Sequence, residues 1–308
     1  MANKSVSRKD YLNNTCFSNN ARRIKGILKH IEDDDISGSG FSQDKNAIDI
    51  IFNNTSSEKV EDILARLTII DSFYSTQMNR RYYGLDELAE SIFLLAKQRK
   101  KPIADLFINF AKNQDTSRFN FTKIEGGHSI PTNLFDEKYG IGKDGGDKGI
   151  AISLISKYAY FETRKHFPIY DSIACEVYPL LWTYCGFLKK EQPKLIVRIK
   201  GSQVINASET MRSYVNAINI LIDKLGGGIS YDHLDRLLWF TGKIRRGNLS
   251  LVLSREQFDN CLDYSQKNHL FKETNEFSIQ KVKDVDKLPF LKKGSLLQDF
   301  FCLAKELQ

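Results

Sequence analysis

Apolar residues recur at helical spacing along most of the chain. In "SSEKVEDILARLTIIDSFYSTQ" (56–77) they occupy every third or fourth position and so share one face of a helix. The same pattern predicts helices at 19–32, 56–77, 85–101, 102–113, 149–161, 171–188, 206–226, 231–247, 254–268 and 294–308. Strand-like patterns are confined to 194–201 and 277–283. The sequence therefore predicts a mainly α-helical protein.

Residues that start or stop helices mark several of these boundaries. Pro102 suits the first turn of its helix, where its missing N–H would have no partner. Asn206 or Ser208 is expected to cap the helix that follows, and Gly226 to end it. Residues 114–148 are polar and contain glycine, and they are too many for a plain loop, so short elements are expected there.

The composition is that of a globular protein. The 308 residues are 41% hydrophobic with a mean hydropathy of −0.38, enough for one large domain or two lobes that share an interface. No apolar run approaches the roughly 20 residues that span a bilayer, and the first residues lack the apolar stretch of a signal peptide. We expect a cytoplasmic protein with no membrane contact.

The cysteines and histidines show no spacing typical of a metal or cluster site. The five cysteines form no CxxC pair and are expected to be reduced and mostly buried; they are Cys16, Cys175, Cys185, Cys261 and Cys302. The five histidines are equally scattered. We therefore expect neither a metal nor a cofactor.

The charge balance favours a polyanionic partner. Lys and Arg number 45 against 38 Asp and Glu, which gives a net charge of +7 and a pI near 9.0. The basic residues recur in clusters, namely "NNARRIKGILKH", "KQRKK", "GKIRRG" and "LKKG". A single cluster is more often a solvated face than a binding surface, but four of them in a chain with 11% aromatic residues favour nucleic acid.

The segment "GIAISLISKYAYFETRKHFPIYDS" (149–172) carries the candidate chemistry. Gly149 permits a tight turn, and the helix after it begins with unpaired N–H groups that favour phosphate. Ser153 and Lys157, four residues apart, share one face of that helix. Pro168 keeps the chain before Asp171 extended and sets that aspartate at the start of the next helix. In the ordinary interpretation Asp171 is a helix cap and Lys157 a solvated charge.

This segment resembles the helix-hairpin-helix core of the DNA glycosylase superfamily that includes endonuclease III-type and oxoguanine-type enzymes. The family pattern is a Gly-hydrophobic-Gly turn, a helix, and a proline-containing turn that ends in an essential aspartate. Residues 149–151 stand at the turn, and Asp171 follows Gly149 by 22 residues. The resemblance is specific at 149–172 and extends in outline over 58–245. It implies a two-lobed glycosylase-like core at 58–245, an N-terminal extension at 1–57 that packs on this core, and a C-terminal helical extension at 246–308.

The resemblance also implies roles for individual residues. Asp171 would stabilise the positive charge that develops on the deoxyribose as the glycosidic bond breaks, with Lys157 as a supporting charge or an amine nucleophile. Gly149, Ala151, Ser153 and Lys148 would hold the DNA backbone. Ala151 replaces the second glycine of the turn, which weakens the phosphate clamp. Ser153 stands where lyase-type members carry a lysine, which favours a monofunctional hydrolase.

Upstream, "FYSTQMNRRYYG" resembles the family's junction between two early helices, which points into the DNA. Ser75, Thr76 and Gln77 match that junction, and Gln77 or Met78 would fill the gap left by a flipped base. Aromatic walls for the base would come from this junction and from the helix that precedes Asp171; the candidates are Phe73, Tyr74, Tyr158, Tyr160 and Phe161.

The resemblance thus implies a DNA glycosylase that hydrolyses the N-glycosidic bond of a flipped-out modified or damaged base. We expect a monomer that acts on duplex DNA. A bulky modified pyrimidine of phage DNA, such as glucosylated hydroxymethylcytosine, fits the departures from the housekeeping members, and the activity would then serve antiviral defence. The alternative is a non-catalytic DNA-binding or damage-sensing module, which the degenerate turn at 149–151 favours. A nuclease would need a carboxylate cluster, for which "EDDD" (32–35) is a poor candidate, and "YGIGKDGG" lacks the ending of a nucleotide-binding loop.

Overall fold

The computed structural model describes residues 8–33, 40–74, 76, 78–142, 146, 148–196, 206–247, 249–253, 256, 259–260, 277–280 and 291–307. Within these residues it contains ten α-helices and three two-stranded antiparallel sheets. The prediction of a mainly α-helical protein is confirmed.

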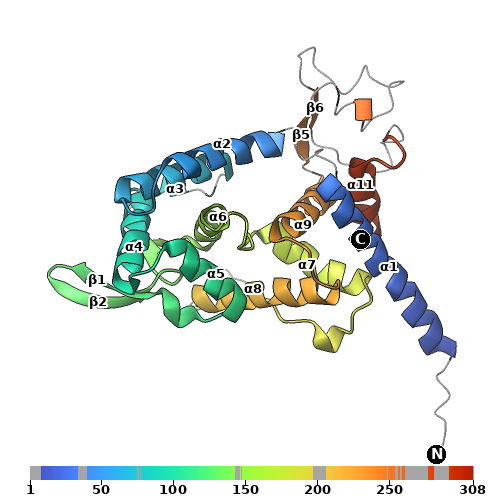
Figure 1. The fold of residues 1–308 in the computed structure, drawn as a ribbon, viewed down its shortest axis with the longest axis horizontal. Coiled ribbons are helices and arrows are strands. Elements are labelled where there is room, and N and C mark those ends of the chain that lie inside the picture. Colours follow the sequence, from blue (N-terminus) through green and yellow to red (C-terminus); the bar gives the residue numbers. More distant parts are fainter. Residues whose placement is uncertain are drawn as a thin grey trace, which may run out of the picture.

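Helix α6 (Ile152–Glu162) runs through the middle of the molecule, with the other helices around it (Figure 1). Its sequence, ISLISKYAYFE, is apolar on every side, which is typical of a helix buried all round. It packs against α2 (Gly40–Asn54), α3 (Val60–Tyr74) and α5 (Ile103–Asn113). The polar side chains of Ser156 and Lys157 are therefore enclosed by protein.

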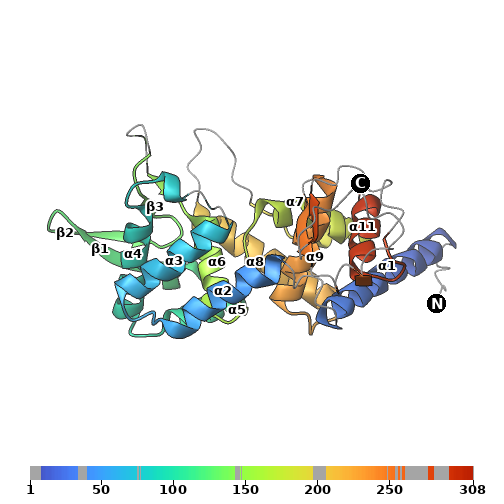
Figure 2. The same ribbon diagram turned by 90° about the horizontal axis from the view of Figure 1, so that it is seen from above.

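The elements on one side of α6 come from the first half of the chain (Figures 1 and 2). Helix α4 (Gly84–Arg99) packs against α3 and against β1 (Asn120–Glu125), which pairs with β2 (His128–Asn133). Two glycines with positive φ at 126 and 127 allow the tight turn of this hairpin. The remaining short elements here are η2 (Met78–Arg80), η3 (Thr116–Phe119), β3 (Lys138–Tyr139) and β4 (Gly149–Ile150). The short elements expected within 114–148 are thus confirmed.

On the other side, both terminal segments pack against the same helix. Helix α9 (Tyr231–Arg245) contacts α7 (Ser172–Tyr184), α1 (Arg8–Asp33) and α11 (Leu296–Glu306). Phe240 of α9 stacks on Phe300 of α11 with ring centroids 4.9 Å apart. Arg23 of α1 pairs with Glu306 of α11, which also accepts a 2.5 Å hydrogen bond from Tyr184 Oη. The other elements are η4 (Lys189–Glu191), α8 (Ala207–Lys224), β5 (Ser250–Leu253) and β6 (Phe277–Gln280).

Several boundaries differ from the sequence prediction. Helix α1 extends well before residue 19, and α2 was not predicted, because its segment is rich in Asn, Asp and Ser. Pro102 is the N-cap of α5 and lies just outside the first turn. Asn206 is the cap of α8, as predicted, and its side chain accepts a 2.9 Å hydrogen bond from Glu209 N. Residues 194–196 are not a strand; 197–201 and most of 254–268 lie outside the described residues.

Substitution by alanine should have opposite effects on stability at two helical glycines, Gly242 and Gly26. A Cβ at Gly242 in α9 would lie 2.1 Å from Ile173 Cγ2, whereas a Cβ at Gly26 in α1 would meet nothing within 4 Å. We expect Gly242→Ala to lower the free energy of unfolding by about 1–3 kcal/mol through overpacking. Gly26→Ala should raise it by roughly 0.5–1 kcal/mol, since alanine is the better helix former. Urea unfolding of both variants checks this, and equal effects would contradict the close α7–α9 packing.

Candidate functional site

Lys157 lies inside the protein, 3% exposed, on the buried helix α6. Its Nζ donates a 2.6 Å hydrogen bond to Ser153 Oγ, one turn earlier on the same face, and lies 5.3 Å from the centre of the Tyr74 ring. Burial lowers the pKa of Lys157, and the nearby carboxylates of Asp171 and Asp235 oppose that fall. The sequence thus placed Ser153 and Lys157 together correctly, but Lys157 is not the solvated charge of the ordinary interpretation.

Asp171 is half-buried at the N-terminus of α7, where its backbone is extended. Its Oδ1 accepts a 2.6 Å hydrogen bond from Ile173 N, so the residue caps the helix. Its Oδ2 accepts no hydrogen bond from the part of the chain that the structure describes. One oxygen therefore fixes the carboxylate, and the other is available to a ligand.

The loop before Asp171 is held from two directions. Tyr214 Oη of α8 donates a 2.7 Å hydrogen bond to Ile169 O, and Tyr170 N donates a 3.0 Å bond to Ser156 Oγ of α6. The rings of Tyr170 and Tyr214 meet edge to face, 5.2 Å apart. These contacts hold the position of Asp171 relative to α6.

A second group of buried charges lies near Lys157 and Asp171. The sequence did not predict this group. Lys45 Nζ of α2 is 2.8 Å from Asp232 Oδ1 and 4.0 Å from Asp235 Oδ2, both on α9. Tyr160 Oη of α6 hydrogen-bonds to Asp232 and receives a 3.0 Å bond from Lys45. Arg236 Nη2 lies 2.9 Å from Asp232 Oδ2. Asp235 occupies a core-facing helical position beside Leu234 and Leu238, a signal that could have revealed it.

The Lys157–Asp171 pair and the group around Lys45 interact through Asp235. The carboxylate of Asp235 attracts the ammonium groups of both Lys45 and Lys157. Burial raises the pKa of Asp235 to about 7; the carboxylates of Asp232 and Asp171 add to the rise, and the two lysines oppose it. Burial also opposes ionisation of Asp232, but Lys45 and Arg236 hold the pKa of that carboxyl below its usual range. Titratable groups shifted in opposite directions within one cluster are typical of functional sites.

The raised pKa of Asp235 should make the free energy of unfolding fall as the pH rises from about 4 to about 7. Between its ordinary pKa of 3.8 and about 7, the folded protein keeps a proton that the unfolded chain has lost. Asp235→Asn cannot ionise, so its stability relative to wild type should grow from pH 4 to 7 and then level off. Urea unfolding at pH 4.5, 6 and 7.5 measures this.

Asp232→Asn is the matched control for this pH dependence, because the lowered pKa of Asp232 stabilises the folded protein above its usual value. This variant should be less stable than wild type over the same range. A constant difference between Asp235→Asn and wild type would contradict the buried position of Asp235.

The residues predicted to hold a DNA backbone are arranged differently from the expectation. Gly149 does not form a tight turn, because it belongs to the short strand β4 and pairs with Tyr139. The Arg81 guanidinium lies against it, so close that a Cβ at this position would be 2.2 Å from Arg81 Cζ. Lys148 forms an ion pair with Glu87, with Nζ 2.8 Å from Oε1. Ala151 is the buried N-cap of α6. Residues 149–150 are therefore a short strand, rather than part of a tight turn, and residue 151 leads from it into α6.

The predicted junction at 75–78 is only partly described. Ser75 and Gln77 lie outside the described residues. Thr76 is half-buried, and its hydroxyl bonds to the buried carboxylate of Asp71, which also accepts a 3.1 Å bond from Met78 N. Met78 is 3% exposed and cannot serve as the wedge without leaving the core. Thr76 holds the chain between α3 and η2.

Three of the aromatic side chains proposed as walls for a base lie in the core. Tyr158 and Tyr160 are fully buried and Phe161 is 3% exposed. Tyr158 packs against Phe52 with ring centroids 5.6 Å apart, so a base there would have to displace core residues. Tyr74 is half-buried beside Lys157, and Phe73 is exposed at the end of α3.

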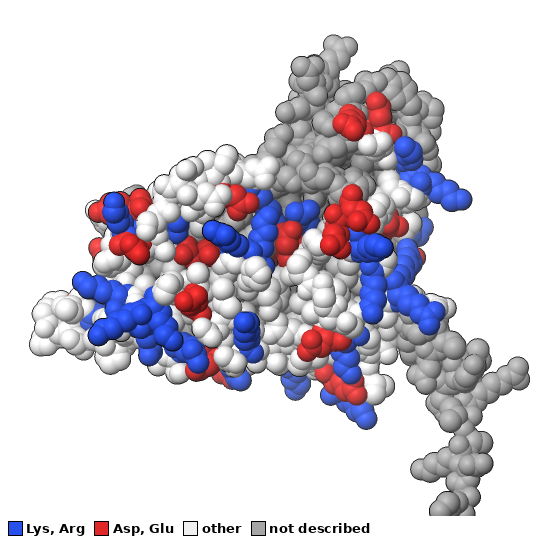
Figure 3. Space-filling model, in the orientation of Figure 1, with Lys and Arg blue, Asp and Glu red and all other residues white. Residues whose placement is uncertain are grey.

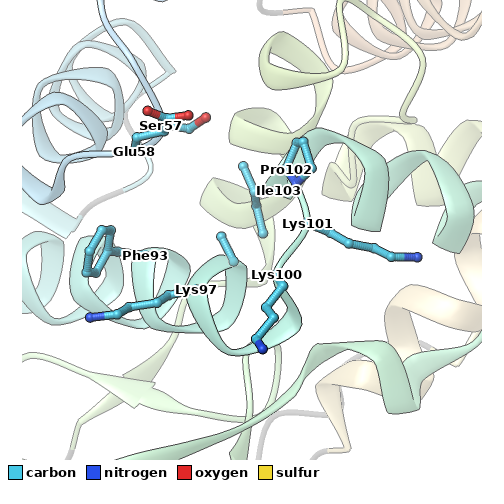
Figure 4. A pocket seen from close by; sticks show the side chains of 9 residues that line it. Ser57, Glu58, Phe93, Lys97, Lys100, Lys101, Pro102 and Ile103 are labelled. Atoms are coloured by element: carbon cyan, nitrogen blue, oxygen red, sulfur yellow. The ribbon is translucent and has the colours of Figure 1, made fainter.

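A pocket of about 360 Å³ lies where α4 meets α5 (Figure 4). Phe93, Ala96 and Ile103 contribute apolar walls, and Glu58 lies across from them. The ammonium groups of the lysines at 97, 100 and 101 extend outward from it. None of the predicted site residues lines this pocket.

Among the described residues, no three His, Cys, Asp or Glu side chains come together as a metal site requires. In the same residues, no helix has the length and apolar character needed to cross a bilayer. No family model, curated protein or solved structure matches the chain. The function is therefore inferred from the site itself and from the resemblance at 149–172.

Proposed function

We propose that the protein is a DNA glycosylase, with a two-lobed helix-hairpin-helix-like core, that hydrolyses the N-glycosidic bond of a modified or damaged base. The observation that carries this proposal is the pair formed by Asp171 and Lys157. The carboxylate is anchored through one oxygen while the other accepts no hydrogen bond from the described chain, and a buried lysine lies within electrostatic reach. Such a carboxylate can stabilise a positively charged sugar without rearranging.

The roles of the two residues follow from their surroundings. Asp171 stands beside the deoxyribose and orients or deprotonates the attacking water. Lys157, fixed by Ser153 and facing the Tyr74 ring, lies within electrostatic reach of Asp171 and adds positive charge near the leaving base. Asp235, with its raised pKa, lies within electrostatic reach of both residues and sets how much negative charge surrounds Lys157.

The alternative function, a non-catalytic DNA-binding module, has support of its own. Asp171 does cap its helix, three of the proposed base walls are core residues, and Gly149 lies in a strand. The hydrolase proposal has the additional support of Lys157, because a merely structural cap does not need a buried lysine next to it.

Mass spectrometry of bases released from DNA tests the proposal. The purified protein is incubated with normal, uracil-containing and glucosylated hydroxymethylcytosine-containing duplexes. Release of a single kind of base establishes the glycosylase and names its substrate, and the glucosylated pyrimidine is the expected product. Strand cleavage is scored separately on the same samples, since a monofunctional hydrolase leaves an intact abasic strand. Binding to all three duplexes without release of any base would favour the binding module.

A further inference from the structure

A basic hollow lies between α1 and the turn that joins α8 to α9. It measures about 260 Å³. Lys25 and Lys29, four residues apart, line it from one face of α1, and His233 lines it from the first turn of α9. Residues 227–229 also line it, together with Leu28, Glu32 and Leu225. Basic side chains are visible along the described part of α1 (Figure 3).

The cations of this hollow have no partners among the residues that the structure describes. Neither Lys25 nor Lys29 forms an ion pair or a hydrogen bond there, and the imidazole of His233 forms none. Glu32 is the single acidic residue in the lining, against two lysines. The hollow therefore carries a net positive charge.

The glycine turn that lines the hollow has two backbone N–H groups without an acceptor in the described chain. Gly226 N and Gly227 N donate to the end of α8, at 2.8 and 3.0 Å, whereas Gly228 N and Ile229 N donate to nothing in the described chain. Gly227 and Gly228 have φ of +71° and +73°, and the space where a Cβ would stand is open. A Cβ at Gly226 would lie 2.5 Å from Lys25 Nζ, so this ammonium lies directly against the turn.

We propose that this hollow binds a phosphate group, held by Lys25, Lys29 and the free amides of the turn. Ammonium groups converging on exposed backbone N–H groups at the start of a helix are the chemistry that binds phosphate in proteins. The proposed function supplies the source, a phosphate of the DNA backbone, and the assignment to DNA rests on that function. The N-terminal helix α1 then contributes directly to DNA binding.

The salt dependence of DNA binding tests this assignment. Lys25→Gln/Lys29→Gln is compared with its parent for binding to a 20-base-pair duplex, both in an Asp171→Asn background so that binding is measured without turnover. Loss of one phosphate contact should reduce the slope of log K against log[salt] by about 0.9 and weaken binding several-fold. Lys112→Gln/Lys190→Gln removes two exposed charges elsewhere and should leave the slope unchanged.

Inorganic phosphate provides an arm that does not depend on DNA. Titrated into the protein, it should shift the His233 side-chain resonance, assigned with His233→Gln, and the shift should be lost in Lys25→Gln/Lys29→Gln. If phosphate shifts the His233 resonance but Lys25→Gln/Lys29→Gln binds DNA as its parent does, the hollow binds phosphate. Its ligand is then a free phosphorylated molecule and not DNA. If the protein binds no DNA but phosphate shifts the His233 resonance, the proposed function is refuted and the hollow is still a phosphate-binding site. An unchanged slope together with no resonance shift would overturn the proposal.

Discussion

Asp171→Asn is expected to lower the rate of base release by about 100-fold or more while the protein stays folded. Asparagine caps a helix about as well as aspartate, so the hydrogen bond from Ile173 N is retained. The substitution removes only the negative charge that would stabilise the developing sugar cation. Released base measured by mass spectrometry, with the melting temperature measured in parallel, separates the two roles of the residue.

Two further variants make this test specific. Asp115 caps η3 through Ser117 N, the same bond that Asp171 makes to Ile173, so Asp115→Asn should leave base release unchanged. Asp171→Ala should lose the cap as well as the charge and lower stability by about 1 kcal/mol. Undiminished release by Asp171→Asn would exclude Asp171 as the catalytic carboxylate.

Lys45→Met is expected to cause the largest loss of stability, about 3–5 kcal/mol in the free energy of unfolding. Lys45 is 2% exposed and is the cation that α2 contributes between Asp232 and Asp235. Methionine fills a similar volume but leaves the two buried carboxylates without that compensation. Chemical unfolding of the variant measures the loss.

The matched control is Lys165→Met, because Lys165 lies 3.8 Å from Asp49 with both side chains over a third exposed. Loss of such an exposed pair should cost less than about 1 kcal/mol. Adding Asp232→Asn to Lys45→Met should recover part of the stability, since it removes one of the carboxylates left behind. Equal effects of the two lysine substitutions would contradict the buried position of Lys45.

The sequence predicted best what depends on neighbours along the chain. The helical spacing in 56–77 and 231–247 corresponds to α3 and α9, and the polar residue before α8 caps it as expected. The face shared by Ser153 and Lys157, and the cap at Asp171, are also local features. Such features follow from backbone geometry, which a single segment determines.

What the sequence missed depends on contacts between distant segments. Lys45 is 187 residues from Asp232, so no local pattern could pair them. The aromatic residues of α6 were proposed as walls for a base because the segment alone does not show that α2, α3 and α5 pack against it. Gly149 was expected in a turn because its pairing with Tyr139 depends on how 114–148 folds back.

The contact between the two terminal helices has a consequence for the order of folding. Arg23 pairs with a residue 283 positions later in the chain, and the apolar face of α1, with Ile24, Ile27 and Ile31, is covered by helices from the second half of the chain. A ribosome releases α1 long before it synthesises α11. The apolar face of α1 therefore stays uncovered in the nascent chain until α7, α9 and α11 have been synthesised, a state in which association with other chains competes with folding.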